Sequence, residues 1–435
     1  MTIAVSPENM EELATLAKKH DVEISVVGKF TSTRKFHVFF NNETIAYLDL
    51  KFLHDGMPQL KLEAEWKKLE YHEPDTKDMP QPSENLKKLL SAPNITTKAE
   101  VIRRYDHEVK GQSVIKPIMR GPCDAAVIKP LFTSEEGIVI SHGICPRYVQ
   151  DSYDMAAMAF DEAVRNALAV GCRFGYMAAL DNFCWPDPVT YDKTPDGKYK
   201  LAQLVRACIA VYDLSIAYGI PLISGKDSMK NDYYGKERKF SILPTLLITV
   251  VGKIDDVKMA VGSAFKKAGD LVYVLGETFD ELGGSEYYKL FGITGNKNPK
   301  VRAEDHAALY KALSSAMEEN LIESCHDVSD GGLAVAFAEC AIGGNVGADL
   351  DLLLLNARTD NEEALLFAES AGRFVVSVKA ENAVRFEYLM NKVQFGKVGR
   401  VRGDKRVIIR KEETLLINEL TEELKNMYNK GVGVQ

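Results

Sequence analysis

The sequence lacks the features that would place the chain in an oxidising compartment or in a membrane. Its seven cysteines are scattered and odd in number, and no two form a CxxC pair, which argues against a disulfide framework or a cysteine-rich zinc site. The amino terminus has no apolar core of a signal peptide, and no apolar run approaches the length of a membrane span. We therefore expect a cytoplasmic protein with no membrane partner.

Positive charge is also in short supply. Lys and Arg number 54 against 62 Asp and Glu, which gives a net charge of -8 and a pI near 5.7. This balance argues against nucleic acid as the main partner, but it leaves room for a local basic pocket that binds phosphate. The remaining composition, 435 residues of which 46% are hydrophobic and 27% charged, is that of a globular chain of about two or three domains.

The first seventy or so residues carry only a small set of predicted elements. Residues 6–20 predict a helix with a serine cap, and short strands are predicted at 22–30, 35–40 and 44–50. One helix and a small sheet are too little for a domain, so we interpret them as the end of something larger. The Pro-rich, charged residues 71–84 predict an exposed linker.

Helical and strand patterns then interleave along the chain, which predicts a mixed α/β (α+β) fold. Apolar residues recur at helical spacing within long segments on both sides of Lys253. We predict helices at 86–90, 98–104, 154–171, 201–219, 303–320, 333–343 and, as a polar carboxy-terminal helix, 414–429; strands are predicted at 137–141, 177–180, 220–224, 240–251, 270–276, 322–327, 371–378 and 407–409.

Four side chains are candidate magnesium ligands. Asp124 precedes an apolar strand in GPCDAAVI, Glu162 and Asn166 share one face of a predicted helix, and Asp330 precedes a glycine pair and a helix. Carboxylate and amide oxygens are hard ligands of the kind Mg²⁺ prefers. Each has a plainer alternative: Asp124 as a turn acid, the Glu162–Asn166 pair as a solvated stripe, and Asp330 as a helix cap.

Three glycine-containing segments are candidates for binding phosphate. In ISGKDSMKND, residues 223–232, a turn after a strand would present backbone amides and one lysine, although its glycine spacing is not that of a P-loop. The two glycine pairs each precede a predicted helix, whose amino terminus favours anions. Polar loops and tight capped turns are the alternatives. The candidate residues are Gly225, Lys226, Asp227, Ser228, Gly283, Gly284, Gly331 and Gly332.

Taken in order, these motifs resemble one family. The runs KAEVIRRYDHEVKGQSV, GPCDAAVI, PRY, DEAVRN, DNF, SGKDS, GDLVYVLGE, LGGSEYYKL and HDVSDGGLAVA are similar to those of phosphoribosylformylglycinamidine synthase. That family belongs to the superfamily of aminoimidazole ribonucleotide synthase, selenophosphate synthetase and thiamine monophosphate kinase. The resemblance implies a PurM-like fold, in which an A domain with a mixed β-sheet flanked by helices is followed by an α/β B domain.

The family enzyme carries two tandem A–B pairs, and the resemblance is to the second pair. It implies that residues 1–70 close a first B domain, 71–97 form a linker and a helix, 98–253 form the second A domain and 254–412 the second B domain. Residues 413–435 would be a carboxy-terminal helical tail. The first A domain is missing, so we expect half of an enzyme.

The resemblance implies a ligase that uses ATP and glutamine-derived ammonia to convert formylglycinamide ribonucleotide into the amidine, with ADP and phosphate released. Lys98 would contact nucleotide phosphate, the glycine segments would line it, and Asp124, Glu162, Asn166 and Asp330 would hold Mg²⁺. The family's His-Cys-x-x-Lys-type stretch, which carries the catalytic histidine, is absent, so no catalytic residue is assigned. The loop 142–148 departs from the family pattern.

The expected partners are the missing amino-terminal half or a homodimer mate, a glutaminase domain or subunit, and a ribonucleotide substrate. Two other functions stay open: a non-catalytic scaffold that holds a structural ADP with Mg²⁺, and another ATP-dependent enzyme of the superfamily that acts as a homodimer.

Overall fold

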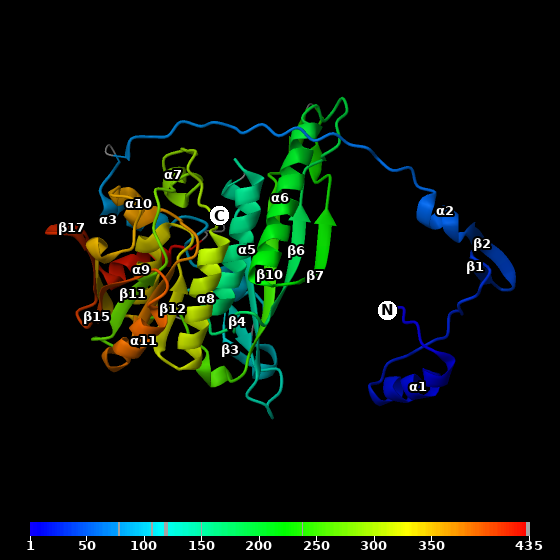
Figure 1. The fold of residues 1–435 in the computed structure, drawn as a ribbon, viewed down its shortest axis with the longest axis horizontal. Coiled ribbons are helices and arrows are strands. Elements are labelled where there is room, and N and C mark those ends of the chain that lie inside the picture. The colour runs from blue at the N-terminus through cyan, green and yellow to red at the C-terminus, as the bar shows by residue number, and fades with distance from the viewer. Residues whose placement is uncertain (77–78, 106–107, 117–120, 149, 237, 432–435) are drawn as a thin grey trace. The chain divides into compact units, whose positions relative to one another are not determined.

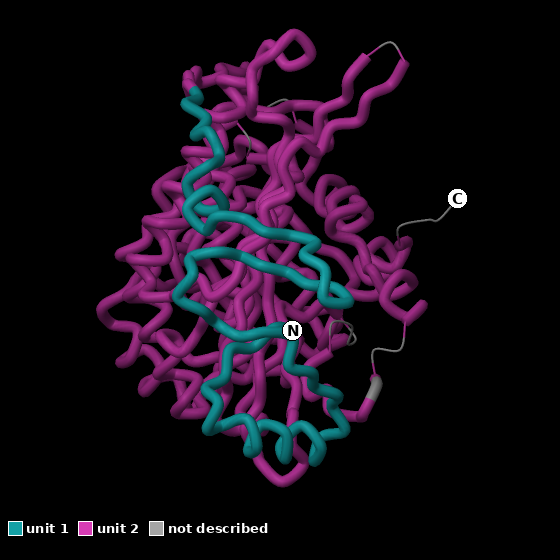
Figure 2. Tube along the Cα trace, turned by 90° about the vertical axis from the view of Figure 1, so that its right-hand side faces the viewer, with its two compact units in different colours: residues 1–62 teal, residues 63–435 magenta. Residues whose placement is uncertain are grey.

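The computed structural model describes residues 1–76, 79–105, 108–116, 121–148, 150–236 and 238–431. The chain divides into two compact units, Met1–Leu62 and Glu63–Gln435 (Figures 1 and 2). The larger unit contains two sheets, which correspond to the expected A and B domains.

The A domain is built on a mixed sheet of six strands in the order β3-β4-β5-β10-β6-β7. Neighbouring strands are antiparallel except β6 and β7, which are parallel. In the central strand β10, buried and half-buried residues alternate along its whole length, as a sheet with one covered face requires. The strands are β3 (Ser113–Ile115), β4 (Ala126–Ile128), β5 (Gly137–Ile144), β6 (Met177–Cys184), β7 (Leu222–Ser228) and β10 (Thr245–Ile254), with a separate hairpin of β8 (Asp232–Tyr234) and β9 (Lys239–Ser241).

Two long helices, α5 (Ser152–Ala169) and α6 (Gly197–Tyr218), pack against each other, and α5 lies on the sheet (Figure 1). Alanines make up much of α5, and small side chains allow it to be buried on several sides at once. Among the described helices, α6 is the one long and apolar enough to cross a membrane, but core helices of folded domains pass the same test.

The B domain is built on a sheet of seven strands in the order β12-β14-β11-β15-β13-β16-β17. Alternate residues of β11 face opposite sides: Tyr273 and Leu275 join the core shared with the A domain, while Val272 and Val274 join a second core under α9. The strands are β11 (Leu271–Leu275), β12 (Ile322–Asp327), β13 (Gly347–Asp351), β14 (Phe374–Val378), β15 (Phe395–Arg402), β16 (Arg406–Lys411) and β17 (Thr414–Leu420). The helices of this region are α3 (Pro82–Leu90), α4 (Ala99–Ile102), α7 (Glu286–Lys289), α8 (Ala303–Glu318), α9 (Gly332–Gly344), α10 (Glu362–Phe367), α11 (Ala383–Met390) and α12 (Thr421–Tyr428).

The carboxy-terminal prediction is wrong in its first half. Residues 414–420 form β17, which pairs antiparallel with β16 at the edge of the B sheet, and only α12 is helical. Sheet pairing overrides the weak local helix pattern here. The expected helical tail 413–435 is therefore a strand and a helix that complete the B domain, and residues 432–435 lie outside the described residues.

A buried carboxylate ties the two domains together. Asp161 on α5 accepts hydrogen bonds from Tyr218 of α6 (2.5 Å) and from Tyr310 of α8 (2.6 Å), and it contacts His306 Nδ1 of α8 at 3.1 Å. It also forms an ion pair of 2.9 Å with the buried guanidinium of Arg165. Burial opposes ionisation of Asp161, but His306 and Arg165 outweigh it and hold its pKa well below the usual range.

The smaller unit consists of a short 3-10 turn (Pro7–Asn9), α1 (Met10–Lys19), a hairpin of β1 (Lys35–Phe40) and β2 (Glu43–Asp49), and α2 (Leu50–Asp55). The predicted helix is confirmed. All of residues 1–62 are described, and Ala17 is the one buried side chain among them. A unit that buries a single alanine has no core of its own.

The smaller unit has the same order of elements as the end of the B domain. Its hairpin and following helix come in the order of β16, β17 and α12, and the two hairpins have strands of the same lengths, six and seven residues. In the B domain, β15 precedes this hairpin and pairs with β11 and β13. Residues 22–30, which precede the hairpin of the smaller unit, form no strand, so the predicted strand at these residues is wrong. A strand without neighbours cannot satisfy its backbone hydrogen-bonding groups.

Replacing Asp161 by Ala should lower the free energy of unfolding by about 3–5 kcal/mol, because it removes the closer of the two carboxylates that pair with the buried Arg165. Urea unfolding followed by circular dichroism measures the change. The matched control is Asp213→Ala, which removes an exposed carboxylate that accepts from Tyr153 and should cost less than about 1 kcal/mol. Equal small losses in both variants would contradict this account of the domain junction.

Candidate functional site

The predicted magnesium ligands come from three segments that meet where the A and B domains join. Asp124 lies two residues before β4, Glu162 lies on α5, and Asp330 lies two residues before α9. Asn166 lies one turn beyond Glu162 and donates its Nδ2 to the backbone carbonyl of His142 on β5 (2.9 Å). A common site for all four side chains stays a prediction.

Asp124 reaches across the domain junction to His326 on β12. Its Oδ1 lies 2.7 Å from His326 Nδ1, and the other ring nitrogen lies 3.1 Å from Glu339 Oε2. Burial opposes charge on this imidazole, but Asp124 and Glu339 outweigh it and raise the pKa of His326 well above its ordinary value. One ligand atom from each of Asp124, His326 and Asp327 lies within 4.8 Å of the others. Histidine spacing along the sequence gave no signal for this, because the partners are carboxylates from other segments.

Glu162 accepts hydrogen bonds, and its carboxylate forms no ion pair with the other described residues. Its Oε2 accepts from the amide of Ile144 (2.8 Å) and lies 3.3 Å from Cys145 Sγ. Shielding from water, together with the nearby negative charge of Asp330, raises the pKa of Glu162 to about 7. A carboxyl in this state gains from a nearby cation, as expected of a metal ligand.

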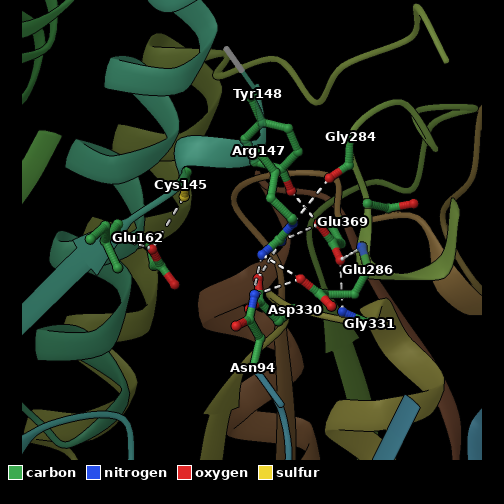
Figure 3. A network of polar contacts seen from close by, with 12 residues as sticks. Asn94, Cys145, Arg147, Tyr148, Glu162, Gly284, Glu286, Asp330, Gly331 and Glu369 are labelled. Carbon is green, nitrogen blue, oxygen red and sulfur yellow. Dashed lines mark hydrogen bonds and ion pairs between the residues drawn. The ribbon is translucent and has the colours of Figure 1, made fainter. Parts of the chain in front are cut away.

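Arg147 is a central residue of this region that the motif analysis did not single out. It belongs to the A domain, in the 3-10 turn Pro146–Tyr148, and its guanidinium contacts Asp330, Glu286 and Glu369 of the B domain (Figure 3). Tyr148 also donates to Glu369. The only sequence signal was the PRY run, because these ion pairs join residues that are far apart in the chain.

The glycine amides predicted to bind phosphate donate to the protein itself. Gly331 donates to Glu369 Oε1 (2.8 Å) and Gly332 to Ser329 O (2.9 Å). Gly283 and Gly284 donate to backbone carbonyls of residues 297 and 294. Gly331 and Gly332 have φ of +80° and +72°, which explains glycine at both positions. The anion at the start of α9 is the Glu369 carboxylate, so phosphate binding by these amides has no geometric support.

The SGKDS segment is a strand, not the predicted turn. Residues 225–228 lie in β7, which pairs with β6 at the edge of the A sheet, and they are exposed or half-buried. Lys226 donates to Ser228 in its own strand. Among the described residues, no hydrogen bond or ion pair joins Gly225, Lys226, Asp227 or Ser228 to the acids at the domain junction. Their role in holding nucleotide phosphate stays a prediction.

A cavity of about 820 Å³ lies beside the acids, within the usual size range of small-molecule sites. Asn94 lines it and also donates to Glu286 (2.6 Å), the partner of Arg147. Its lining residues are 94–100, 102–104, 121–123 and 428–431, and they include the cations Lys98, Arg103, Arg104 and Lys430. Lys98 Nζ donates to Thr96 O at 2.5 Å. Burial lowers the pKa of Lys98, against the opposing charge of Asp330.

Two family descriptions match the chain. The AIR synthase related protein, N-terminal domain, matches residues 122–254, and the C-terminal domain of the same family matches 267–412. Curated relatives include the phosphoribosylformylglycinamidine synthase subunit PurL of Thermococcus sibiricus, 32% identical over 99% of this chain and 57% of the relative. The same subunit of Ignicoccus hospitalis is 33% identical over 98% of this chain and 58% of the relative. The chain thus spans little more than half the length of these relatives.

Solved structures of similar fold include Thermotoga maritima PurL complexed with FGAR, with a TM-score of 0.61 at 18% identity over 79% of this chain and 53% of that one. T. maritima PurL complexed with ATP has a TM-score of 0.54 at 19% identity over 81% of this chain and 56% of that one. At such identities these structures support the mixed α/β fold with its A and B domains.

Replacing His326 by Gln should lower the free energy of unfolding by about 3 kcal/mol, because it removes the cation between the buried carboxylates of Asp124 and Glu339. Chemical unfolding measures the change. His142→Gln is the control, since that imidazole is exposed on β5, and it should change the free energy by less than about 0.5 kcal/mol. A His326 variant as stable as the control would show that a positive charge on this imidazole does not stabilise the fold.

Proposed function

The chain belongs to the family of AIR synthase related proteins, and we propose that it is the nucleotide-binding half of a phosphoribosylformylglycinamidine synthase. The whole enzyme would be an ATP-dependent carbon–nitrogen ligase of purine biosynthesis. It would convert formylglycinamide ribonucleotide and glutamine-derived ammonia into formylglycinamidine ribonucleotide, with ADP and phosphate released. The observation that carries the proposal is a basic cavity close to the domain junction where Asp124, Glu162 and Asp330 lie, together with a buried Asp124 oxygen that has no hydrogen-bond partner among the described residues.

The carboxylates fit a magnesium ion. Asp124 Oδ2 is buried and has no hydrogen-bond partner among the described residues, and burial together with the negative charge of Asp330 raises the pKa of Glu162 against the opposing charge of Arg165. An all-oxygen donor set from Asp124, Glu162, Asn166 and Asp330 is the kind that Mg²⁺ selects. When bound, the ion would neutralise charge on nucleotide phosphate oxygens.

The cavity supplies the remaining positive charge. Lys98 lines this cavity, and the negative charges of Asp330, Glu339 and Glu286 act on its ammonium. Arg103, Arg104 and Lys430 add cations to the same lining. We infer that these side chains bind the polyphosphate of ATP or ADP and fix its position, which is the main protein contribution to phosphoryl transfer.

A structural rather than catalytic role for the nucleotide is the second candidate. One observation favours it: the four glycine amides predicted to hold phosphate already donate within the protein. These four amides are therefore not available to stabilise a phosphoryl group during its transfer. Under this alternative the chain is a scaffold half that keeps ADP and Mg²⁺ bound, and another half carries the chemistry.

The smaller unit supports the need for another half. Residues 22–30 correspond to a strand that is held between two others in the B domain, and those two neighbours have no counterpart in residues 1–62. The family's first A–B pair would supply them. Ammonia would come from a separate glutaminase domain or subunit. A homodimer of another ATP-dependent enzyme of the family would leave the smaller unit without a purpose. The proposed setting is the cytoplasm.

ADP with Mg²⁺ should raise the thermal unfolding midpoint of the chain by several degrees, because a ligand that binds only the folded state stabilises it. Lys98→Met should remove most of the shift, and Asp124→Asn should remove the part that depends on Mg²⁺. Differential scanning fluorimetry measures these shifts.

Lys226→Met is the matched control, since this lysine is exposed on β7, and it should keep the full shift. A shift lost in Lys226→Met and kept in Lys98→Met would place the nucleotide at β7 instead of the cavity. Absence of any shift with ADP, ATP and Mg²⁺ in the unmodified chain would overturn the proposed function.

Amides of residues 22–30 should exchange with solvent within seconds in the chain alone and become protected when the missing half is added, because the new neighbouring strands would then take up their hydrogen bonds. Hydrogen exchange with mass spectrometry measures this. Helix α9 is the internal control and should be protected in both samples. Restored turnover of formylglycinamide ribonucleotide without protection of residues 22–30 would contradict the strand assignment.

A further inference from the structure

The guanidinium of Arg147 contacts three carboxylates and one backbone carbonyl. Nη2 lies 2.6 Å from Asp330 Oδ1 and 3.0 Å from Glu369 Oε2, while Nη1 lies 2.9 Å from Glu286 Oε1 and 3.3 Å from Asp330 Oδ2. Nε donates to Gly284 O at 3.0 Å. One positive charge therefore faces three carboxylates, and all of them belong to the B domain (Figure 3).

Asp330 differs from the other two carboxylates in what else holds it. Glu369 also accepts from Tyr148 and from the amides of Gly331 and Glu286. Glu286 also accepts from Asn94. Among the described residues, Arg147 is the hydrogen-bonding partner of both oxygens of Asp330, whose side chain is 35% exposed. Asp330 can therefore leave Arg147 more easily than the two glutamates can.

A divalent cation would compete with Arg147 for Asp330. The fork of Arg147 occupies both oxygens of this carboxylate, and its positive charge repels a second cation at contact distance. Loss of Asp330 would leave the guanidinium attached to Glu286, Glu369 and Gly284, so it could release Asp330 without leaving its place.

From this geometry we propose that Arg147 is a tethered cation that holds Asp330 while no metal is bound and gives it up to the divalent ion that enters with the nucleotide. The proposal rests on the proposed function, because it needs Asp330 to become a ligand. Arg147 is then a positioning residue. It keeps Asp330 in place and the two domains joined in the metal-free chain, and its displacement lowers the affinity for metal.

The test is Mn²⁺ binding to the full chain, measured by electron paramagnetic resonance in the presence of ADP. Arg147→Met should bind Mn²⁺ about tenfold more tightly than the unmodified chain, because the competing charge is gone. Arg147→Lys keeps the charge but loses the fork, and it should lie between the two. The control Arg385→Met removes an equivalent two-bond pair with Glu319 (2.5 and 2.7 Å) on the exposed surface of the B domain and should leave binding unchanged.

Unchanged or weaker Mn²⁺ binding by folded Arg147→Met would overturn the proposal and leave the proposed function standing. No binding by the unmodified chain would overturn both. If Arg147→Met does not fold, a crystal structure of the unmodified chain with Mn²⁺ and ADP decides. We expect Asp330 on the metal and Arg147 still on Glu286 and Glu369, and an intact Arg147–Asp330 fork beside bound metal would refute the displacement.

Discussion

Burial of charge between two domains is the constraint on which the rest of this structure depends. A charged group removed from water is tolerated only where partners of opposite charge or good donors surround it. Helix α5 carries Asp161 and Arg165 into the junction, and the partners that satisfy them come from α6, α8 and β12. Separation of the domains would remove the partners that α8 and β12 supply, so the charges of α5 help to fix how the A and B domains sit together.

The same constraint distinguishes structural acids from functional ones. Asp161 and Glu162 are neighbours in sequence, yet Asp161 is surrounded by two hydroxyls, an imidazole and a guanidinium, whereas Glu162 meets a backbone amide and a thiol. Their pKa values move in opposite directions as a result. Glu162 is thus opposed by less positive charge than Asp161, and this makes it a better ligand candidate than its neighbour.

The sequence predicted those parts of the fold and site that depend on local pattern. Helix α5, the alternating strand β10 and the positions of Asp124 and Asp330 at element ends follow from periodicity and turn residues. Long-range strand pairing could not be predicted. Residues 22–30 have no neighbouring strand and stay irregular, whereas residues 414–420 pair with β16 and become β17. The SGKDS residues pair with β6 as part of β7 instead of forming a turn. Arg147 and His326 were missed for the same reason, because the carboxylates that Arg147 binds, and the Asp124 partner of His326, lie more than a hundred residues away along the chain.

The amino terminus of α9 binds a carboxylate of the protein itself. Helix amino termini and glycine amides bind phosphate in many proteins, but here Glu369 occupies that position and is itself neutralised by Arg147. The amide of Gly331 therefore helps to position Glu369, which pairs with Arg147 of the A domain. A nucleotide bound in the adjacent cavity, as we propose, would depend on side-chain cations and on a divalent ion shared with acids from both domains. Its binding would then be coupled to the domain junction, because Asp124 and Asp330 already pair with His326 and Arg147 across that junction.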